Sequence, residues 1–271
     1  GIPPGESEDP LAPPELSLSD PRVFFGSRPQ LYAVLNTNAP QVAGSGPTEV
    51  ETGFQPVAEG SEEAQGIRMG GILRTLALAW RFRDANLLFA SEVTPESRFV
   101  FRRNVVERAS AIAPFLRFFE APYPVIHDGR IMWILEGFTA TRSFPLASPQ
   151  DLPGSGMASY LRNSVKVTVD AVSGETRFYT MDPEDPILQA WARVFPELLQ
   201  PLEAMPPTLR THIRYPKALL ELQARVLLQY HQETAPRFHG QQDVWAIPQE
   251  LGQGSRPLWY EPEYGYFRLP G

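Results

Sequence analysis

Residues 163–200 constrain the fold more than any other part of the chain, because two strand patterns there lead through an acidic corner into a helical one. Valine alternates with polar residues over 165–170, which predicts a strand with one face packed inward and the other in water. Ser173-Gly174 predicts a turn, and residues 176–181 have the composition of a strand that returns antiparallel. This part of the chain is therefore expected to form a β-hairpin.

A helix is predicted directly after the hairpin. Asp185 has the side chain of a helix N-cap, and Pro186 suits the first helical position. An apolar stripe then repeats at helical spacing and consists of Ile187, Leu188, Trp191, Val194 and Phe195. Pro196 is expected to restart the helix rather than to continue it.

Before the hairpin, the sequence predicts a strand, a loop and two helices. Residues 31–35 are rich in β-formers, whereas residues 38–70 contain much Gly, Pro, Ser and Glu and predict a long surface loop. A helix is expected from Ile72, and the residues spaced along one of its faces are Ile72, Leu73, Leu76, Ala79, Trp80 and Arg83. Another helix is expected from about Asn104, and Pro114 should end or kink it.

From Tyr123 the pattern changes from helical to extended. Two β-rich runs, 123–126 and 131–141, flank Asp128-Gly129, which tolerates the backbone angles of a tight hairpin turn. Residues 142–160 predict a second loop. A last long helix is expected up to about Glu233, and its buried side is assigned to Leu219, Leu220, Leu222, Val226, Leu227 and Tyr230. Strands in hairpins with flanking helices indicate an α+β fold with a mostly antiparallel sheet.

The composition limits the class of protein. A net charge of −7 argues against general nucleic-acid binding, which requires a basic surface. The absence of cysteine excludes disulfides and thiolate metal sites. No apolar run in the sequence is long enough to cross a bilayer, so the chain by itself is expected to be soluble.

The domain boundaries are predicted from composition. Residues 1–21 are rich in proline and acids and predict a linker, and residues 22–243 are expected to form one α+β domain. Residues 244–271 predict an aromatic, proline-rich C-terminal extension that packs on this domain. Its aromatic residues are Trp245, Trp259, Tyr260, Tyr264, Tyr266 and Phe267. Alternation over 264–269 favours a packed edge strand over a surface that binds sugars, proteins or a membrane.

The candidate ligand-binding residues are Arg98, Arg102, Arg103, Glu107, Arg108 and Asp128. Thr94-Pro95 has the pattern of a helix start, which would bring Arg98 and Arg102 onto one helical face as donors for a carboxylate, a phosphate or a lipid head group. The alternative is structural ion pairing on that helix, because Arg103 and Glu107 are also four residues apart. Structural pairing explains much of the cluster without any ligand.

No metal site is predicted. Asp182, Glu184 and Asp185 could supply oxygen ligands to calcium, but helix capping accounts for these acids with fewer assumptions. The four histidines lack the spacing of known metal or catalytic motifs; they are His127, His212, His231 and His239. His231 and His239 with Asp243 form the best set of distant residues, and the preferred interpretation of the histidines is structural.

Several blocks of the sequence are distinctive together: residues 21–37, 91–116, 128–141, 160–187, 209–231 and the closing YFRLPG. They resemble uncharacterised protein family 0182, whose members are large integral membrane proteins of bacteria and archaea. The resemblance runs from about residue 20 to the C-terminus and departs mainly over 38–66. It implies a bundle of transmembrane helices that precedes this region, and a large soluble part outside the cytoplasm. It transfers no catalytic residue and no ligand.

Two classes of function follow as hypotheses. The first is a non-catalytic extracytoplasmic module of a cell-membrane protein, which serves assembly, sensing or substrate capture. Its expected partners are the transmembrane region of the parent protein and a lipid or envelope component, with no cofactor and no nucleic acid. The second is a cell-envelope enzyme with Arg102, Arg103, Glu107 and Asp128 as its polar set, or a lipid- or glycan-binding module. A pocket that gathers these four residues would favour the enzyme.

Overall fold

The computed structural model describes residues 18–28, 32–38, 56–57, 66–152, 156–240, 245–246, 249–250, 258–259 and 264. The chain divides into two compact units, the first formed by residues 1–139 and 164–213 and the second by residues 140–163 and 214–271. The expected division into a linker, a 22–243 domain and a 244–271 extension stays a prediction.

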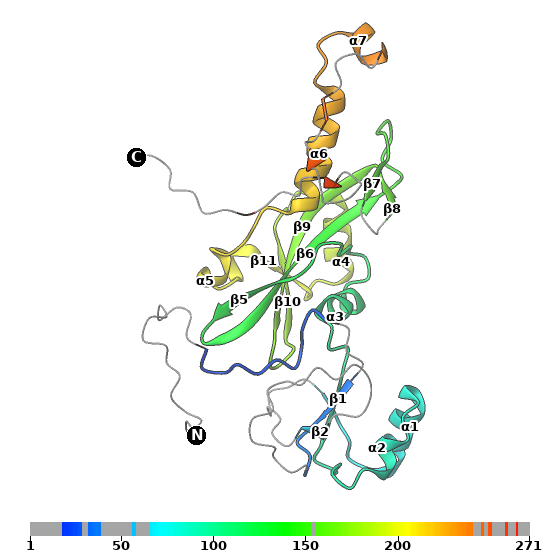
Figure 1. Ribbon diagram of the computed structural model, residues 1–271, viewed down its shortest axis with the longest axis vertical. Helices are drawn as coiled ribbons and strands as arrows, with labels where there is room; N and C mark the ends of the chain where they lie inside the picture. The colour runs from blue at the N-terminus through cyan, green and yellow to red at the C-terminus, as the bar shows by residue number, and fades with distance from the viewer. Residues whose placement is uncertain are drawn as a thin grey trace. The chain divides into compact units, whose positions relative to one another are not determined.

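A five-stranded sheet lies mainly in the first unit (Figure 1). In spatial order its strands are β11 (Leu199–Pro201), β10 (Thr176–Thr180), β9 (Tyr160–Asp170), β6 (Arg130–Thr141) and β5 (Tyr123–His127). Both predicted hairpins are confirmed, because β5 pairs with β6 and β9 pairs with β10 in antiparallel register. Asp128 and Gly129 have φ values of 49° and 71°, the left-handed angles that a tight turn requires. With its flanking helices, the sheet confirms an α+β fold.

β11 corrects the prediction for Pro196. α4 (Pro186–Val194) ends before this proline, and no helix restarts there. Leu199 instead pairs in parallel with Phe178 of β10. Leu198 and Leu199 pack against the main core, so burial of their side chains favours an extended segment over another helical turn.

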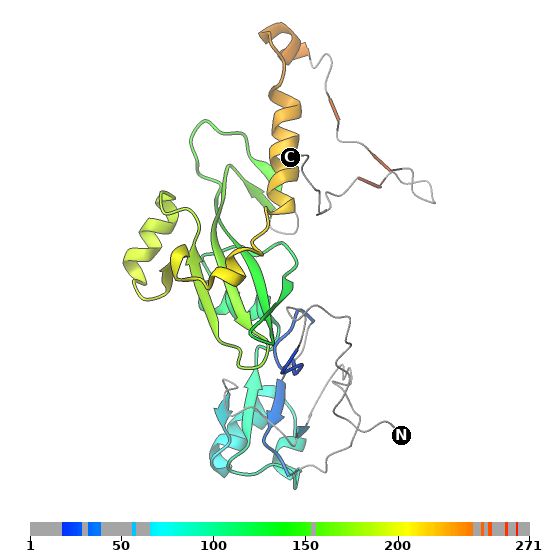
Figure 2. The same cartoon turned by 90° about the vertical axis from the view of Figure 1, so that its left-hand side faces the viewer.

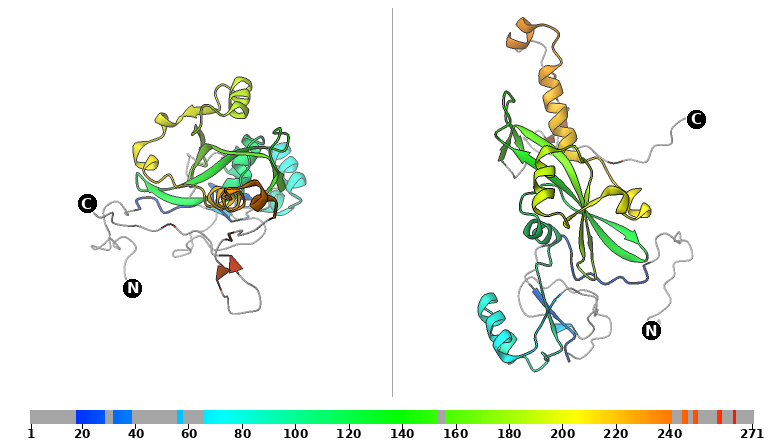
Figure 3. Two further views of the ribbon diagram at one scale, coloured as in Figure 1. Left: turned by 90° about the horizontal axis from the view of Figure 1, so that it is seen from above. Right: turned by 180° about the vertical axis from the view of Figure 1, so that it is seen from behind.

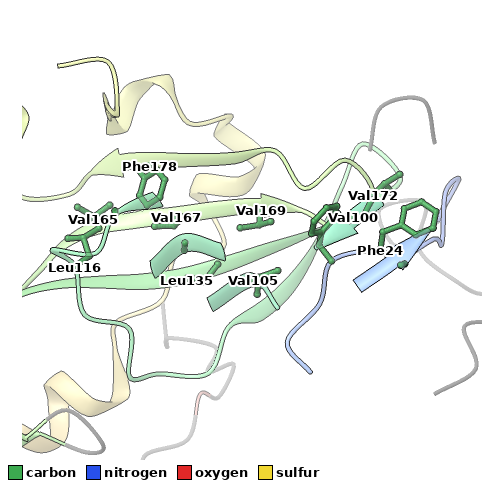
Figure 4. Packing of buried hydrophobic residues seen from close by; sticks show 14 of the residues in the cluster. Phe24, Val100, Val105, Leu116, Leu135, Val165, Val167, Val169, Val172 and Phe178 are labelled. Carbon is green, nitrogen blue, oxygen red and sulfur yellow. The ribbon is translucent and has the colours of Figure 1, made fainter. Parts of the chain in front are cut away.

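One face of the five-stranded sheet packs against α3 (Val105–Ile112) and α4, and Figure 3 shows α4 in front of the sheet when it is seen from behind. Asp185 caps α4 as predicted, because its side chain accepts a hydrogen bond from Ile187 N at 3.0 Å. α3 ends before Pro114, also as predicted. Figure 4 shows this core, with Phe24, Val100, Val105, Leu116, Leu135, Val165, Val167, Val169, Val172 and Phe178.

The other face of the sheet is also covered, and the expectation that the polar residues of β9 meet water is wrong. Lys166 and Thr168 are each 1% exposed. Tyr179 lies directly opposite Lys166 in the register and belongs to a second core, which contains Val125, Ile134, Tyr179, Met205 and Leu209. The cover is supplied by η2 (Leu202–Ala204) and α5 (Pro207–Arg210), which follow β11 in the chain.

Lys166 can be buried because its ammonium group pairs with the carboxylate of Glu136 on β6. Burial lowers the pKa of Lys166, and this effect outweighs the opposing effect of Glu136 and Glu120. A buried charge without a partner costs several kcal/mol, on the order of 3–5, so the two side chains depend on each other. Alternation along β9 predicts the strand correctly but does not reveal what covers its polar face.

A second, four-stranded sheet also belongs to the first unit and has the order β2 (Pro56–Val57), β1 (Tyr32–Leu35), β4 (Arg98–Phe101) and β3 (Ile67–Arg68). β1 confirms the strand expected over 31–35, from Tyr32 onward. The described parts of the loop expected over 38–70 include β2 and β3, and most of that loop lies outside the described residues. α1 (Ile72–Phe82) and α2 (Asn86–Phe89) lie beside this sheet (Figure 2).

β4 corrects the helix start expected at Thr94-Pro95. The hydroxyl of buried Ser97 donates a hydrogen bond to Asn36 O at 2.8 Å and accepts one from Thr94 N at 2.9 Å, which holds a turn. The next residues pair with β1 as a strand. Phe99 and Val100 are fully buried in different core clusters, so packing on both faces of β4 outweighs the local helix-start pattern.

α1 confirms the helix expected from Ile72, but most of the face picked out by its spacing is exposed. Its exposed apolar members are Ile72, Leu73, Leu76 and Trp80. Leu78, Ala79 and Phe82 form the inner side instead, together with Leu87 of α2. The end of α1 is tied to β1, because the hydroxyl of Tyr32 donates a hydrogen bond to Asp84.

The second unit contains α6 (Lys217–Tyr230), α7 (Ala235–Gly240) and the strand pairs β7 (Gln150–Leu152) with β8 (Gly156–Ala158) and β12 (Gln249–Glu250) with β13 (Leu258–Trp259). The loop expected over 142–160 therefore contains a short hairpin. α6 confirms the last long helix, although Leu220, Leu227 and Tyr230 are exposed rather than buried. In the parts of the chain that the structure describes, no helix is long and apolar enough to cross a membrane.

The aromatic tail is described only in part. Tyr264 donates a hydrogen bond to Tyr215 O at 2.5 Å, and its ring centroid lies 5.1 Å from Arg214 Cζ and 5.2 Å from Lys217 Nζ. The side chain of Trp259 and the residues Tyr260, Tyr266 and Phe267 lie outside the described residues, and so does the edge strand expected over 264–269. Tyr264 thus contacts other residues of the second unit through both its ring and its hydroxyl.

Candidate functional site

A groove of about 430 Å³ lies beside the four-stranded sheet of the first unit. Its lining residues are Ile67, Leu78, Arg81, Phe82, Phe101, Arg102 and Glu107. Leu78, Arg81 and Phe82 are spaced i, i+3, i+4, so they lie on one side of α1. β3, β4 and the first turn of α3 supply the other walls. The groove combines apolar surface with two guanidinium groups and one carboxylate.

Arg102 reaches this groove from a strained backbone position. Its φ is 52°, a left-handed value that costs a residue other than glycine about 1–2 kcal/mol. Arg102 lies in the turn from β4 into α3, and directly after it Gly26 N donates to Arg103 O and Val105 N donates to Gly26 O. Strained residues are concentrated at functional sites, which supports a functional role for Arg102.

Both guanidinium groups of the groove lie over aromatic rings. Arg102 Cζ is 5.7 Å from the ring centroid of Phe101, and Arg81 Cζ is 5.9 Å from that of Phe82. Within the described ranges, no ion pair joins either arginine to an acidic residue. Their N–H groups can therefore donate to an anionic ligand such as a carboxylate or a phosphate, with apolar surface beside it.

Two of the predicted arginines donate hydrogen bonds to backbone carbonyls of distant segments. Arg103 is buried, and its Nε donates to Phe24 O at 2.8 Å. Arg108 lies 4.7 Å over the ring of Phe25 and donates from Nε to Gly174 O at 2.8 Å. Burial lowers the pKa of both guanidinium groups. These arginines hold the N-terminal segment and the β9–β10 turn against the core.

The helical arrangement expected for the arginine cluster is wrong. Arg98 lies on β4, opposite Arg68 of β3, so it shares no helical face with Arg102. Arg103 precedes the N-cap of α3, so it is not paired with Glu107 across a helical turn. The local pattern favoured a helix, whereas pairing of β4 with β1 and β3 decided for a strand.

Of the four polar residues expected in an enzyme site, only Arg102 and Glu107 line this groove. Arg103 is buried in the core, and Asp128 occupies the exposed β5–β6 turn, 3.4 Å from His127 Nε2. Sequence reasoning missed Arg81, which comes from α1. The available signal was the pair Leu78 and Phe82, four residues apart with Arg81 three residues after Leu78, but this pair lies off the face that the pattern emphasised.

Asp185 of the acidic corner and His231 contact other side chains of the protein. No group of three or more His, Cys, Asp or Glu side chains arranged to hold a metal occurs among the residues with described positions. Asp185 Oδ2 accepts hydrogen bonds from the hydroxyls of Thr139 and Ser164, each at 2.5 Å, in addition to capping α4. His231 stacks on Trp245 with ring centroids 4.3 Å apart, and Asp243 lies outside the described residues.

Comparison with known proteins places the chain in a family. The sequence model of the uncharacterised protein family UPF0182 matches residues 2–271. A UPF0182 protein of Cupriavidus necator is 38% identical over 257 residues, which cover 93% of this chain and 27% of that protein. A UPF0182 protein of Bradyrhizobium diazoefficiens is 37% identical over 265 residues, which cover 97% of this chain and 27% of that protein.

A UPF0182 protein of Moorella thermoacetica is 36% identical over 256 residues and again matches 27% of its length. The chain thus spans about a quarter of the length of the relatives that it matches. No solved structure matches this fold. The match of the family model over nearly the whole chain shows that the chain belongs to the uncharacterised protein family UPF0182.

Proposed function

We propose that this chain is a non-catalytic, extracytoplasmic binding module of a membrane protein, and that the groove beside α1 captures an anionic ligand with an apolar part. The observation that supports the proposal most directly is the pair of guanidinium groups, Arg81 and Arg102, beside Leu78, Phe82 and Phe101. Each guanidinium can donate to a carboxylate or phosphate, and the aromatic surface beside it can contact an alkyl chain.

The composition of the groove also favours ligand binding over catalysis. Its polar groups are two guanidinium groups and the Glu107 carboxylate, and arginine stays protonated at neutral pH. Glu107 is an acceptor that could contact a hydroxyl or an amine of the same ligand. An amphiphile with an anionic head group, such as a lipid or another envelope component, matches this combination.

The test is calorimetric titration of the chain with two ligands, octyl phosphate and inorganic phosphate. Octyl phosphate is kept below the concentration at which this amphiphile aggregates. Octyl phosphate should bind more tightly, because the alkyl chain adds apolar contact. Arg81→Gln and Arg102→Asn should each weaken binding about 10-fold or more, since one charge-assisted hydrogen bond contributes roughly 1.5–3 kcal/mol. Asparagine tolerates the left-handed φ at position 102.

Arg177→Gln is the matched control, because Arg177 lies on β10 and pairs with Glu175 outside the groove. Its affinity for octyl phosphate should equal that of the unchanged chain. Absence of binding, or binding that both groove variants leave unchanged, would overturn the proposed ligand.

A further inference from the structure

A continuous apolar face of α1 has no partner among the described residues. Ile72, Leu73 and Trp80 are 81%, 81% and 84% exposed, and Leu76 is 51% exposed. Their spacing of i, i+1, i+4 and i+8 places them on one side of the helix. Phe89 of the neighbouring α2 is also 84% exposed. Monomeric proteins rarely leave so many large apolar side chains together in water, which marks an interaction surface.

The charge of this segment is opposite to that of the chain. Residues 66–83 contain Arg68, Arg74, Arg81 and Arg83 and no acidic residue, although the whole chain has a net charge of −7. Arg74 and Arg81 are seven residues apart and therefore lie along the same edge of α1, next to the apolar face. An apolar face bordered by arginines and containing a tryptophan is the composition of a helix that lies in a membrane interface.

We propose that α1 docks on the surface of an anionic lipid bilayer. Ile72, Leu73, Leu76 and Trp80 enter the boundary between head groups and acyl chains, while the arginines contact anionic head groups. A helix of 11 residues is about 16 Å long, roughly half of the ~30 Å hydrocarbon thickness, so α1 lies along the bilayer rather than across it. This inference rests on the membrane location proposed above, but it does not depend on ligand binding in the groove.

Charge favours a bilayer over a second copy of the chain. A symmetric contact between two copies through this face would bring both sets of arginines together, and like charges at an interface oppose association. Anionic lipid provides opposite charge and an apolar phase at the same surface.

Flotation with vesicles tests the proposal. The full chain should float with vesicles of phosphatidylcholine and phosphatidylglycerol and bind pure phosphatidylcholine at least about 10-fold more weakly, with the preference reduced at high salt. Leu73→Ser/Leu76→Ser should reduce binding at least about 10-fold, because two leucines no longer enter the apolar phase. Leu220→Ser/Leu227→Ser, on the exposed side of α6, is the matched control and should float like the unchanged chain.

A spectroscopic measurement locates the contact. Because the chain has no cysteine, Leu76→Cys accepts a single environment-sensitive fluorophore, and Ala190→Cys, at an exposed position of α4, gives the control. Anionic vesicles should shift the emission of the label at 76 to the blue and leave that at 190 unchanged. Equal shifts at both positions, or no shift at 76, would overturn docking through α1.

The remaining outcomes also decide. Equal binding to neutral and anionic vesicles contradicts the proposal, and so does the absence of flotation. If the chain binds no vesicles but self-associates, and Leu73→Ser/Leu76→Ser abolishes this self-association, α1 docks on a second copy of the chain and the proposal is wrong. The groove is tested separately: Leu73→Ser/Leu76→Ser should keep octyl phosphate binding, and Arg102→Asn should keep flotation. Each proposal can therefore fail without the other.

Discussion

At the scale of single residues, the turn between β9 and β10 shows how one glycine permits a core contact. Gly174 has a φ of 74°, and a Cβ at this position would lie 2.4 Å from an atom of the Phe25 ring. Arg108 also packs here: its guanidinium lies over the Phe25 ring, and its Nε donates a hydrogen bond to Gly174 O. Serine followed by glycine predicted the turn, but nothing near it in the sequence pointed to Phe25.

Gly174→Ala is therefore expected to lower the free energy of unfolding by about 2–4 kcal/mol, from the left-handed backbone and from the overlap with Phe25. Urea denaturation followed by circular dichroism measures the change. Gly26→Ala is the control, because Gly26 has no left-handed φ and its added Cβ would lie at an ordinary contact distance of 3.7 Å from Val23. Its effect should stay within about 0.5 kcal/mol. Equal losses for the two variants would show that the contact with Phe25 is unimportant.

Tyr32 provides a prediction that depends on pH. Burial, together with its hydrogen bond to Asp84, raises the pKa of Tyr32 well above its usual value of 10.0. The folded state thus keeps this proton at pH values where the unfolded chain loses it. The stabilisation by Tyr32 is complete below pH 10 and is lost as the pH rises above it.

Tyr32→Phe should cost about 1–3 kcal/mol at pH 7, because the hydrogen bond to a charged group is removed while the ring remains. The difference between the unchanged chain and the variant should narrow as the pH rises above 10. Urea denaturation at a series of pH values provides the measurement. A gap that stays constant up to pH 11 would contradict a raised pKa.

At the scale of elements, helix starts were predicted well where the capping residue also has a tertiary role. Asp185 was identified as an N-cap from its position before Pro186, and the structure adds the hydroxyls of Thr139 and Ser164 as further donors. Thr94-Pro95 has a comparable pattern but starts no helix, because the residues after it pair into β4. A local sequence pattern thus predicts a helix or strand, but strand pairing and burial of side chains determine whether that element forms.

Asp185→Ala should therefore be more damaging than loss of a cap alone. We expect about 3–5 kcal/mol, because the N-cap is lost and two buried hydroxyls lose a shared acceptor. Asn104→Ala, which removes the N-cap of α3 and an exposed hydrogen bond to Ser27 O, should cost only about 1–2 kcal/mol. Chemical denaturation of both variants gives the comparison, and similar losses would mean that the hydroxyls contribute little.

At the scale of the whole molecule, the first unit is built from distant parts of the chain. Its three core clusters draw residues from Phe24 to Ile213 and none from beyond that point. The segments that cover the two faces of the five-stranded sheet lie before, between and after its strands. The stability of this unit therefore depends on contacts between segments far apart in sequence.

A chain that ends at Pro216 is accordingly expected to keep a cooperative thermal transition within a few degrees of the transition of the first unit in the full chain. Near-ultraviolet circular dichroism and calorimetry measure it, because they report fixed aromatic packing and cooperativity. A shortened chain without a cooperative transition would show that residues 217–271 are needed for the first unit to fold.

The sequence by itself determined the α+β class, both hairpins of the larger sheet, α1, α3, α4 and α6, and the family. The structural features depend on periodicity, turn chemistry and capping, which act over a few residues, whereas the family follows from the resemblance of whole sequence blocks. Only the tertiary structure decided that Lys166 is buried, that Arg103 and Arg108 bond to backbone carbonyls of distant segments, and that Arg81 joins Arg102 and Glu107 in a groove. Such outcomes depend on which segments cover a face, and a one-dimensional pattern shows a polar or apolar stripe without its partner.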